Sequence, residues 1–261
     1  MLKRVMIAGL GISLCLSATN LAAADVPAKE ATPAVRQADA PAQPQTVPAG
    51  VAREPGKVEG VPHRDPSADS KLIDLTNYYT LGLNEDASGA FGYTLSSLPK
   101  GVQRLGNTDY DLRGIVQVSG QQFVTSNKEF PEVVKGIRVR LKCEKLSFLQ
   151  ATHWSEDKGV QIGTYVIHYI SGDKVEIPIR YGIDLRDWIF RQNPATPAKP
   201  GAQPSMPIAL WTGKDKDKPT VDYLLFEKKW TNPRPDLEIV SIDLVSAMTN
   251  AAPFLVAVTA Q

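Results

Sequence analysis

The sequence contains little of what most catalytic and metal sites need. It has 2 cysteines and 3 histidines among 261 residues, and Cys143 is the only cysteine beyond the N-terminal apolar run. One cysteine forms no internal disulfide, so the apolar core must hold the fold together. The chain also lacks the Gly-x-Ser-x-Gly elbow, the His-Glu-x-x-His and Cys-x-x-Cys motifs and the phosphate-binding Gly-x-x-x-x-Gly-Lys loop. These absences favour a protein that is not an enzyme, with no cofactor.

The chain also lacks a large excess of charges of one sign. The formal net charge is 29 − 28 = +1, which gives no electrostatic reason to expect a nucleic acid or an anionic membrane as partner. The longest apolar run, Val5 to Leu16, has about twelve residues, against the roughly twenty that a spanning helix needs. We therefore expect no transmembrane span in the mature chain.

The N-terminal region has the pattern of a secretory signal peptide. Lys3 and Arg4 precede the apolar run, and the small residues 22–24 follow it. The sequence predicts a signal peptide at residues 1–24 and export to the periplasm, the cell surface or the medium. Residues 25–70, rich in proline and alanine, are predicted to be a disordered linker, because they offer too little apolar surface to offset chain entropy.

From residue 71 to 261 the dominant hydrophobic period is two. Ile137, Val139 and Leu141, for example, alternate with basic residues, which is typical of strands with one apolar face. We predict an all-β domain, an antiparallel β-sandwich or jelly roll, with a barrel as the alternative. The best helical candidate is a short turn at residues 131–135, and the proline-rich segment 193–207 is expected to be a surface loop. Further predicted strands are residues 102–105, 114–119, 145–152, 165–170, 174–181, 208–211, 221–226, 237–245 and 254–258, of which 165–170 and 254–258 are expected to be buried on both faces.

Four segments resemble a known kind of module. They are YDLRGIVQV (residues 110–118), LSFLQATHW (146–154), YGIDLRDW (181–188) and the stretch from Trp230 to Thr259. They are similar to a module common in planctomycete and verrucomicrobial proteins, which in turn resembles galactose-binding-like jelly rolls of the carbohydrate-binding type. The likeness covers roughly residues 72–259. It implies a jelly-roll fold and glycan binding, and it implies no catalytic residue.

Tryptophans next to polar residues are the candidate ligand contacts. Trp188, Trp211 and Trp230 each lie beside loop-like sequence, where an indole face could stack on a pyranose while neighbouring polar groups bind its hydroxyls. Core packing is the alternative for each ring. The candidate ligand-binding residues are Trp188, Trp211, Trp230, Arg186, Asp187, His153 and Trp154.

Carboxylates leave two further hypotheses open. Asp109 with Asp111, and Asp184 with Asp187, are the pairs that a glycoside hydrolase could use. Structural ion pairs are the alternative, with Asp184, Arg186 and Asp187 as one cluster and Arg234 with Asp236 as another. The Asp-Lys-Asp stretch 215–217 does not continue as a calcium loop, so no metal site is predicted, although a structural calcium ion stays open.

Together these patterns predict an exported, non-catalytic binding module whose partner is an extracellular or envelope glycan. A structural or protein-interaction module of an envelope or secreted assembly is the contrasting hypothesis. A glycoside hydrolase is the third.

Overall fold

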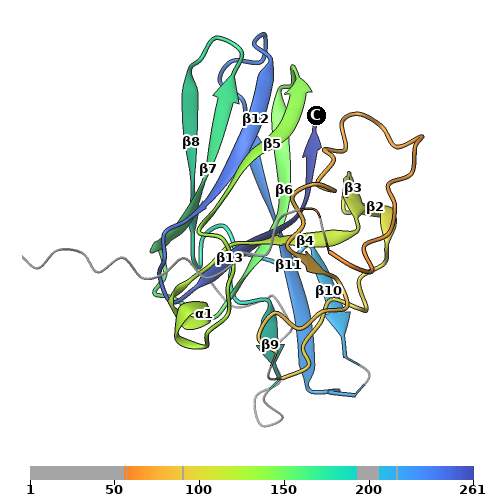
Figure 1. The fold of residues 1–261 in the computed structure, drawn as a ribbon, viewed down its shortest axis with the longest axis vertical. Coiled ribbons are helices and arrows are strands. Elements are labelled where there is room, and N and C mark those ends of the chain that lie inside the picture. The colour runs from red at the N-terminus through yellow and green to blue at the C-terminus, as the bar shows by residue number, and fades with distance from the viewer. Residues whose placement is uncertain (1–55, 57, 90, 193–205, 216) are drawn as a thin grey trace, which may run out of the picture. The chain divides into compact units, whose positions relative to one another are not determined.

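The computed structural model describes residues 56, 58–89, 91–192, 206–215 and 217–261, which belong to a compact unit spanning Val47–Gln261. This unit is all-β with antiparallel sheets, as the hydrophobic period predicts (Figure 1). Its elements are β1 Leu81–Gly82, β2 Gly101–Leu105, β3 Thr108–Leu112, β4 Gly114–Gln117, α1 Gln121–Thr125, β5 Val133–Leu141, β6 Lys145–His153, β7 Gln161–Tyr169, β8 Lys174–Arg180, β9 Ile189–Arg191, β10 Trp211–Lys214, β11 Val221–Thr231, β12 Ile239–Ser246 and β13 Ala252–Ala260.

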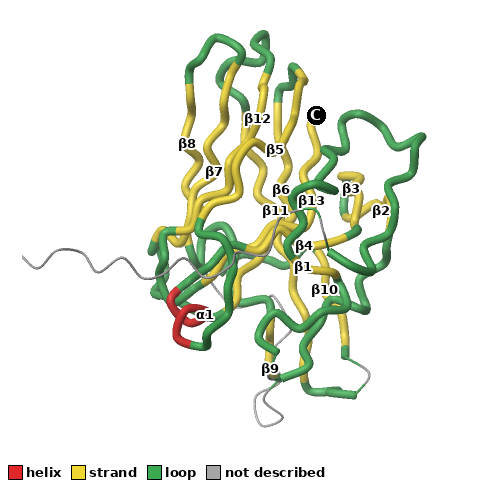
Figure 2. Tube along the Cα trace, viewed as in Figure 1, coloured by secondary structure: helices red, strands yellow, loops and turns green. Residues whose placement is uncertain are grey.

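Two sheets form the body of the domain. The larger one has the strand order β1-β4-β13-β6-β11-β10, with β9 also paired to β11, and the smaller one has the order β5-β12-β7-β8. Strands β2 and β3 form a separate hairpin (Figure 2). Strands that follow one another along the chain are often not neighbours in a sheet. For example, β13 lies between β4 and β6. This mixed order is compatible with the predicted jelly roll.

The inner faces of the two sheets meet at an aromatic contact. Phe148 of β6 stacks on Tyr165 of β7 with ring centroids 4.2 Å apart, and the Tyr165 hydroxyl donates to Gln150 Oε1 at 2.8 Å. The other face of β6 and β13 is covered by the chain before β4, where Tyr110 of β3 donates a hydrogen bond to Glu227 at 2.7 Å. The large sheet is therefore covered on both sides.

Strand burial follows from these layers. Every residue of β13 is buried, which confirms the prediction for residues 254–258. The same expectation for residues 165–170 was wrong: in β7 the buried residues alternate with half-buried ones, because the outer face of the small sheet carries no further layer there. Alternation of this kind is normal for a sheet with one wet face.

Two local predictions also need correction. The only helix among the described residues is α1, which lies ten residues before the predicted turn at 131–135, and Val133 already begins β5. The strand expected at 208–211 instead begins at Trp211, and Ile208 is 80 % exposed. No helix in the described part of the chain is long and apolar enough to cross a membrane. The predicted signal peptide lies outside the described residues, as does segment 193–205.

Residues 58–70, which composition assigns to the linker, lie on the folded domain. Val58 and Val61 pack against the core, and Arg64 forms an ion pair with buried Asp111 at 2.9 Å. The prolines of this stretch limit its regular structure without preventing these contacts. Of the linker predicted for residues 25–70, residues 25–55 and 57 lie outside the described residues.

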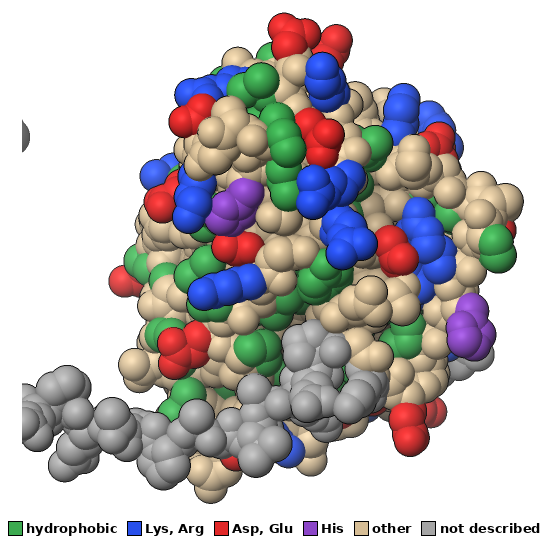
Figure 3. All heavy atoms as spheres, turned by 45° about the horizontal axis from the view of Figure 1, so that its top comes forward, with side chains coloured by type: hydrophobic (Ala, Val, Ile, Leu, Met, Phe, Trp, Pro, Cys, Tyr) green, Lys and Arg blue, Asp and Glu red, His purple; other side chains and the backbone are tan. Residues whose placement is uncertain are grey.

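Surface charges are mixed, as the near-zero net charge implies. On the face that Figure 3 shows, basic and acidic side chains lie interspersed among hydrophobic ones.

Candidate functional site

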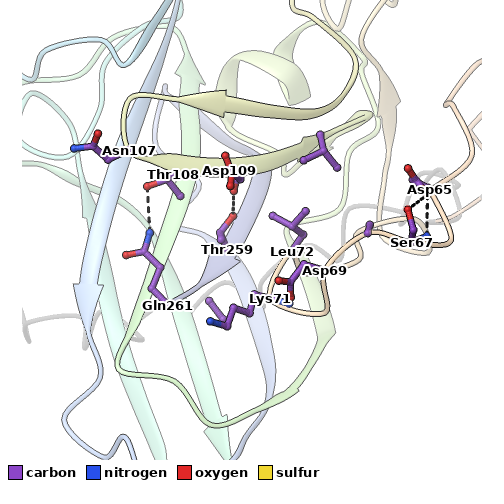
Figure 4. Close-up of a pocket in the computed structure, with 13 residues that line it drawn as sticks. Asp65, Ser67, Asp69, Lys71, Leu72, Asn107, Thr108, Asp109, Thr259 and Gln261 are labelled. Atoms are coloured by element: carbon purple, nitrogen blue, oxygen red, sulfur yellow. Dashed lines mark hydrogen bonds between the residues drawn. The ribbon is translucent and has the colours of Figure 1, made fainter.

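A cavity of about 580 Å³ lies at the C-terminal end of β13. Three parts of the chain meet there: the loop at residues 65–72, the β2–β3 hairpin, and the last residues of the domain (Figure 4). Most of the residues that line it are polar, and the full set is Asp65, Ser67, Ala68, Asp69, Lys71, Leu72, Val102, Asn107, Thr108, Asp109, Thr259, Ala260 and Gln261. We call it the polar cavity.

Two Asx turns shape the loop on one side of this cavity. Asp65 Oδ1 accepts hydrogen bonds from the backbone N–H and the hydroxyl of Ser67, at 2.8 and 2.7 Å. Asp69 Oδ1 accepts one from the Lys71 N–H at 2.8 Å. An aspartate two residues before its donor is a local turn signal. Each carboxylate uses Oδ1 for its turn, and its Oδ2 accepts no hydrogen bond from any residue that the structure describes.

A tight hairpin forms the opposite side. Leu105 pairs with Thr108, so Gly106 and Asn107 are the two turn residues. Gly106 has φ +58°, and a positive φ at the first turn position is the requirement of a type II′ turn, which glycine meets without strain. The turn presents the Asn107 side chain at one end of the cavity, with Asp65 at the other (Figure 4).

The end of β13 fixes both sides to the domain. The Thr259 hydroxyl donates to the Asp109 carbonyl at 2.6 Å, and the Gln261 amide donates to the Thr108 hydroxyl at 3.1 Å. Across the cavity, the Ala260 N–H donates to the Lys71 carbonyl at 2.8 Å. The cavity walls are thus held by hydrogen bonds to one strand end, which preorganises them.

The lining combines hydrogen-bonding groups with an apolar surface of about the same extent. Three carboxylates outnumber one ammonium group, since Asp65, Asp69 and Asp109 face the cavity with Lys71. The hydrogen bond from the Ser67 hydroxyl lowers the pKa of Asp65, so this carboxylate accepts rather than donates hydrogen bonds at neutral pH. Leu72 and Val102 supply the larger apolar side chains.

The sequence-predicted residues His153, Trp154 and Trp188 come together in a different place. Trp188 is only 4 % exposed, stacks on Tyr223 with centroids 5.0 Å apart, and donates its indole N–H to His153 Nδ1 at 3.1 Å. This hydrogen bond assigns the His153 proton to Nε2. Burial lowers the pKa of His153 to about 3, so its ring is neutral. Trp154 is half-buried in the same aromatic cluster, edge-on to Phe123.

Trp211 and Trp230 lie apart from each other on the large sheet. Trp211 pairs with Leu225 and Trp230 pairs with Leu146. Because Leu225 and Trp230 are five positions apart on β11, about 17 Å, their side chains point to opposite faces of the sheet. Both indoles are half-buried against the core. The three predicted tryptophans thus do not form one binding surface.

Arg186 and Asp187 lie close to this region without forming the expected ion-pair cluster. Arg186 is 5 % exposed, its guanidinium lies over the rings of Phe190 and Phe226 at 5.6 and 5.9 Å, and its Nε and Nη2 donate to no described residue. Burial raises the pKa of Asp187 to about 6. The cluster prediction was wrong because aromatic rings, rather than carboxylates, surround the guanidinium.

The other carboxylates are engaged in ion pairs with partners that the sequence analysis did not name. Asp184 binds Lys228 at 2.6 Å, and Asp111 binds Arg64 and Arg113, each at 2.9 Å. Arg234 pairs with Asp173 rather than with the predicted Asp236. Structural ion pairs were expected, but sequence proximity gave the wrong partners.

Sequence reasoning missed the polar cavity because its residues lie far apart along the chain. One side falls in the segment assigned to the linker, and the hairpin strand β3 was not predicted. Two signals could have found its walls: the Asp-x-Ser and Asp-x-Lys spacings at residues 65–71, and the Gly-Asn pair between two short strands. In comparisons with known proteins, no protein-family model matches this chain, and no curated protein matches it.

Proposed function

We propose that this protein is an exported, non-catalytic binding module that binds carbohydrate in the polar cavity. The observation that carries the proposal is the preorganised cavity of about 580 Å³ at the end of β13. This volume falls within the range of about 300–1,000 Å³ that is usual for small-ligand sites.

The chemistry of the lining suits a polyhydroxylated ligand. Sugar hydroxyls donate to carboxylates and exchange hydrogen bonds with amides, and hydrogen bonds to charged groups are stronger than neutral ones. Asp65, Asp69 and Asp109 provide the carboxylates, and Asn107 and Gln261 provide the amides. The apolar C–H face of a pyranose could rest on Leu72 and Val102.

The family resemblance, the fold and the predicted signal peptide support the same proposal. The resemblance to galactose-binding-like jelly rolls implies glycan binding, and the antiparallel two-sheet fold is compatible with that architecture. The predicted signal peptide would bring the domain to a compartment where polysaccharides are exposed. Fold alone does not define function, so the cavity is the main support.

Asp109→Ala is expected to weaken glycan binding by tenfold or more and Asn107→Ala by less, because the first removes a charged cavity group and the second a neutral one. Among the described residues, the Asp109 side chain pairs only with the exposed Arg104, at 3.3 Å, so both variants should remain folded. Binding would be measured by calorimetry against a panel of neutral and acidic oligosaccharides. One lost hydrogen bond involving a charged group costs about 1.5–3 kcal/mol, which is tenfold or more in affinity.

Asp236→Ala is the matched control, since Asp236 is an exposed aspartate before β12 and outside the cavity lining. Its affinity should equal that of the unmodified protein. If Trp211→Ala or Trp230→Ala abolished binding while the cavity variants did not, the tryptophan hypothesis would replace the cavity. No binding of any glycan by folded protein would overturn the proposal in favour of a protein-interaction module.

A further inference from the structure

A second cavity of about 310 Å³ lies on the other side of the chain segment that borders the polar cavity. Leu72 lines both cavities, so the two cavities adjoin at this residue. Residues 65, 67–69 and 71 face the polar cavity, whereas residues 64, 70, 73 and 74 face the second one. Its remaining lining comes from Asn77, Tyr78 and β5 residues 138–140. We call it the arginine cavity.

The arginine cavity has cationic groups that the fold does not use. Arg64 is committed to Asp111 at 2.9 Å, and Asp74 is committed to Arg113 at 2.7 Å. The exposed Arg138 side chain makes no hydrogen bond or ion pair with any described residue. Arg140, 57 % exposed at its side chain, lies 3.5 Å from Glu238. At least one guanidinium is therefore open to an anion.

Arg138 lies on an edge of the small sheet, beside other polar and basic side chains. Strand β5 is an edge strand of the small sheet, and the cross-strand register places Arg138 beside Ser241, then His168, then Lys174. Side chains directly opposite each other on antiparallel strands share a face. Arg138 thus begins a row with no acidic side chain, and His168 in that row is bound to Asp243 at 2.8 Å. The Asp243 carboxylate is bound to His168 and to the Gly136 N–H, each at 2.8 Å, so Arg138, which lines the arginine cavity, has no carboxylate partner among the described residues.

The two neighbouring cavities differ in charge. The polar cavity holds three carboxylates and one lysine, which repel an anionic group. The arginine cavity holds three arginines and one aspartate, which attract one. An extended ligand that fills both would place uncharged hydroxyl groups in the first and a negative charge in the second.

We propose that the arginine cavity is an anion subsite, and that the ligand class is an acidic polysaccharide whose charged sugar neighbours an uncharged one. The carboxylate or sulfate of the charged sugar binds Arg138, whose planar guanidinium fits either group in a bidentate manner. The uncharged sugar occupies the polar cavity. This inference rests on the proposed carbohydrate binding and names its substrate class.

The test uses three oligosaccharides with one backbone: chondroitin, which carries carboxylates, carboxyl-reduced chondroitin sulfate, which carries sulfates, and carboxyl-reduced chondroitin, which is neutral. Calorimetry at low salt on the whole protein should give at least tenfold tighter binding for one of the charged forms. Which form binds more tightly identifies the group. Arg138→Gln should remove that preference and leave the affinity for the neutral form unchanged.

Arg180→Gln is the matched control, because this substitution removes an equal charge at a distant place. Arg180 ends β8, at the opposite edge of the same sheet. It should keep the preference. Equal affinity for the three forms, or a preference that survives Arg138→Gln, would overturn the anion subsite while leaving carbohydrate binding intact. Binding of other neutral glycans, without any binding of the charged forms, would also overturn the anion subsite and leave carbohydrate binding intact. No binding of any glycan would overturn the proposed function itself.

Discussion

Arg113→Met is expected to lower the free energy of unfolding by about 3–5 kcal/mol, the cost of removing one partner from a buried ion pair. Arg113 is 1 % exposed. Its Nε donates to Asp111 at 2.9 Å, its Nη1 to the Thr76 hydroxyl at 2.7 Å and its Nη2 to Asp74 at 2.7 Å. Methionine fills similar volume without these bonds. Urea unfolding followed by circular dichroism measures the change.

Arg104→Met is the matched control for this prediction. Arg104 also pairs with an aspartate, Asp109 at 3.3 Å, but 63 % of its side chain is exposed. An exposed pair contributes at most about 1 kcal/mol. Equal effects of the two substitutions would contradict the claim that the Arg113 network anchors residues 64–76, one wall of both cavities, to the domain.

A second large effect is expected in the pH dependence of stability, where two buried groups act in opposite directions. The pKa of His153 falls to about 3 in the folded state, against about 6.5 when unfolded. The unfolded state therefore holds the extra proton between pH 3 and 6.5. The free energy of unfolding then falls as the pH falls, by about 1.4 kcal/mol per unit.

Asp187 changes the free energy of unfolding with pH in the opposite direction. Its pKa rises to about 6, against about 3.9 when unfolded, so the folded state holds the extra proton between these values. The free energy of unfolding then falls as the pH rises through this window. Because the interval between the folded and unfolded pKa values is narrower for Asp187 than for His153, the contribution of Asp187 is expected to be the smaller one. The unmodified protein should lose only a little stability between pH 6 and 4.

Substituting one of the two residues should reveal the pH dependence of stability that the other one causes. Asp187→Asn keeps an acceptor for the Ile189 N–H, which Asp187 Oδ1 binds at 3.0 Å, and should lose about 3 kcal/mol between pH 6 and 4. His153→Asn keeps an acceptor for Trp188 and should become more stable over the same interval, from a lower starting value. The measurement is urea unfolding at pH 4, 5 and 6. Parallel curves for all three proteins would contradict the neutral His153 and the protonatable Asp187.

The sequence predicted most strands because each sheet has a clear hydrophobic pattern. In β5, buried Ile137 and Val139 alternate with exposed Arg138 and Arg140, and period two follows directly from such a face. In β13 both faces are buried, and a continuous apolar run gives the strand equally well. Short strands such as β1 and β9, with two and three residues, have too few positions for any period.

The candidate site was far less predictable from the sequence. Trp188 was expected at a ligand because it adjoins charged residues, but its indole donates to a buried histidine and packs on Tyr223. Adjacent residues on an extended chain point in opposite directions, so polar neighbours say little about where a ring points. The polar cavity depends on Leu72 bridging to Thr259, a contact between chain segments that no local pattern encodes.

The central claim is that a carbohydrate binds in the polar cavity rather than at the tryptophans. Chemical-shift mapping of backbone amides, with the tightest-binding oligosaccharide of the panel, tests it most directly. The account predicts the largest shifts at residues 65–72, 106–109 and 259–261, whose side chains or neighbours line the cavity. Largest shifts around Trp188, Trp211 or Trp230, with the cavity amides unchanged, would contradict it.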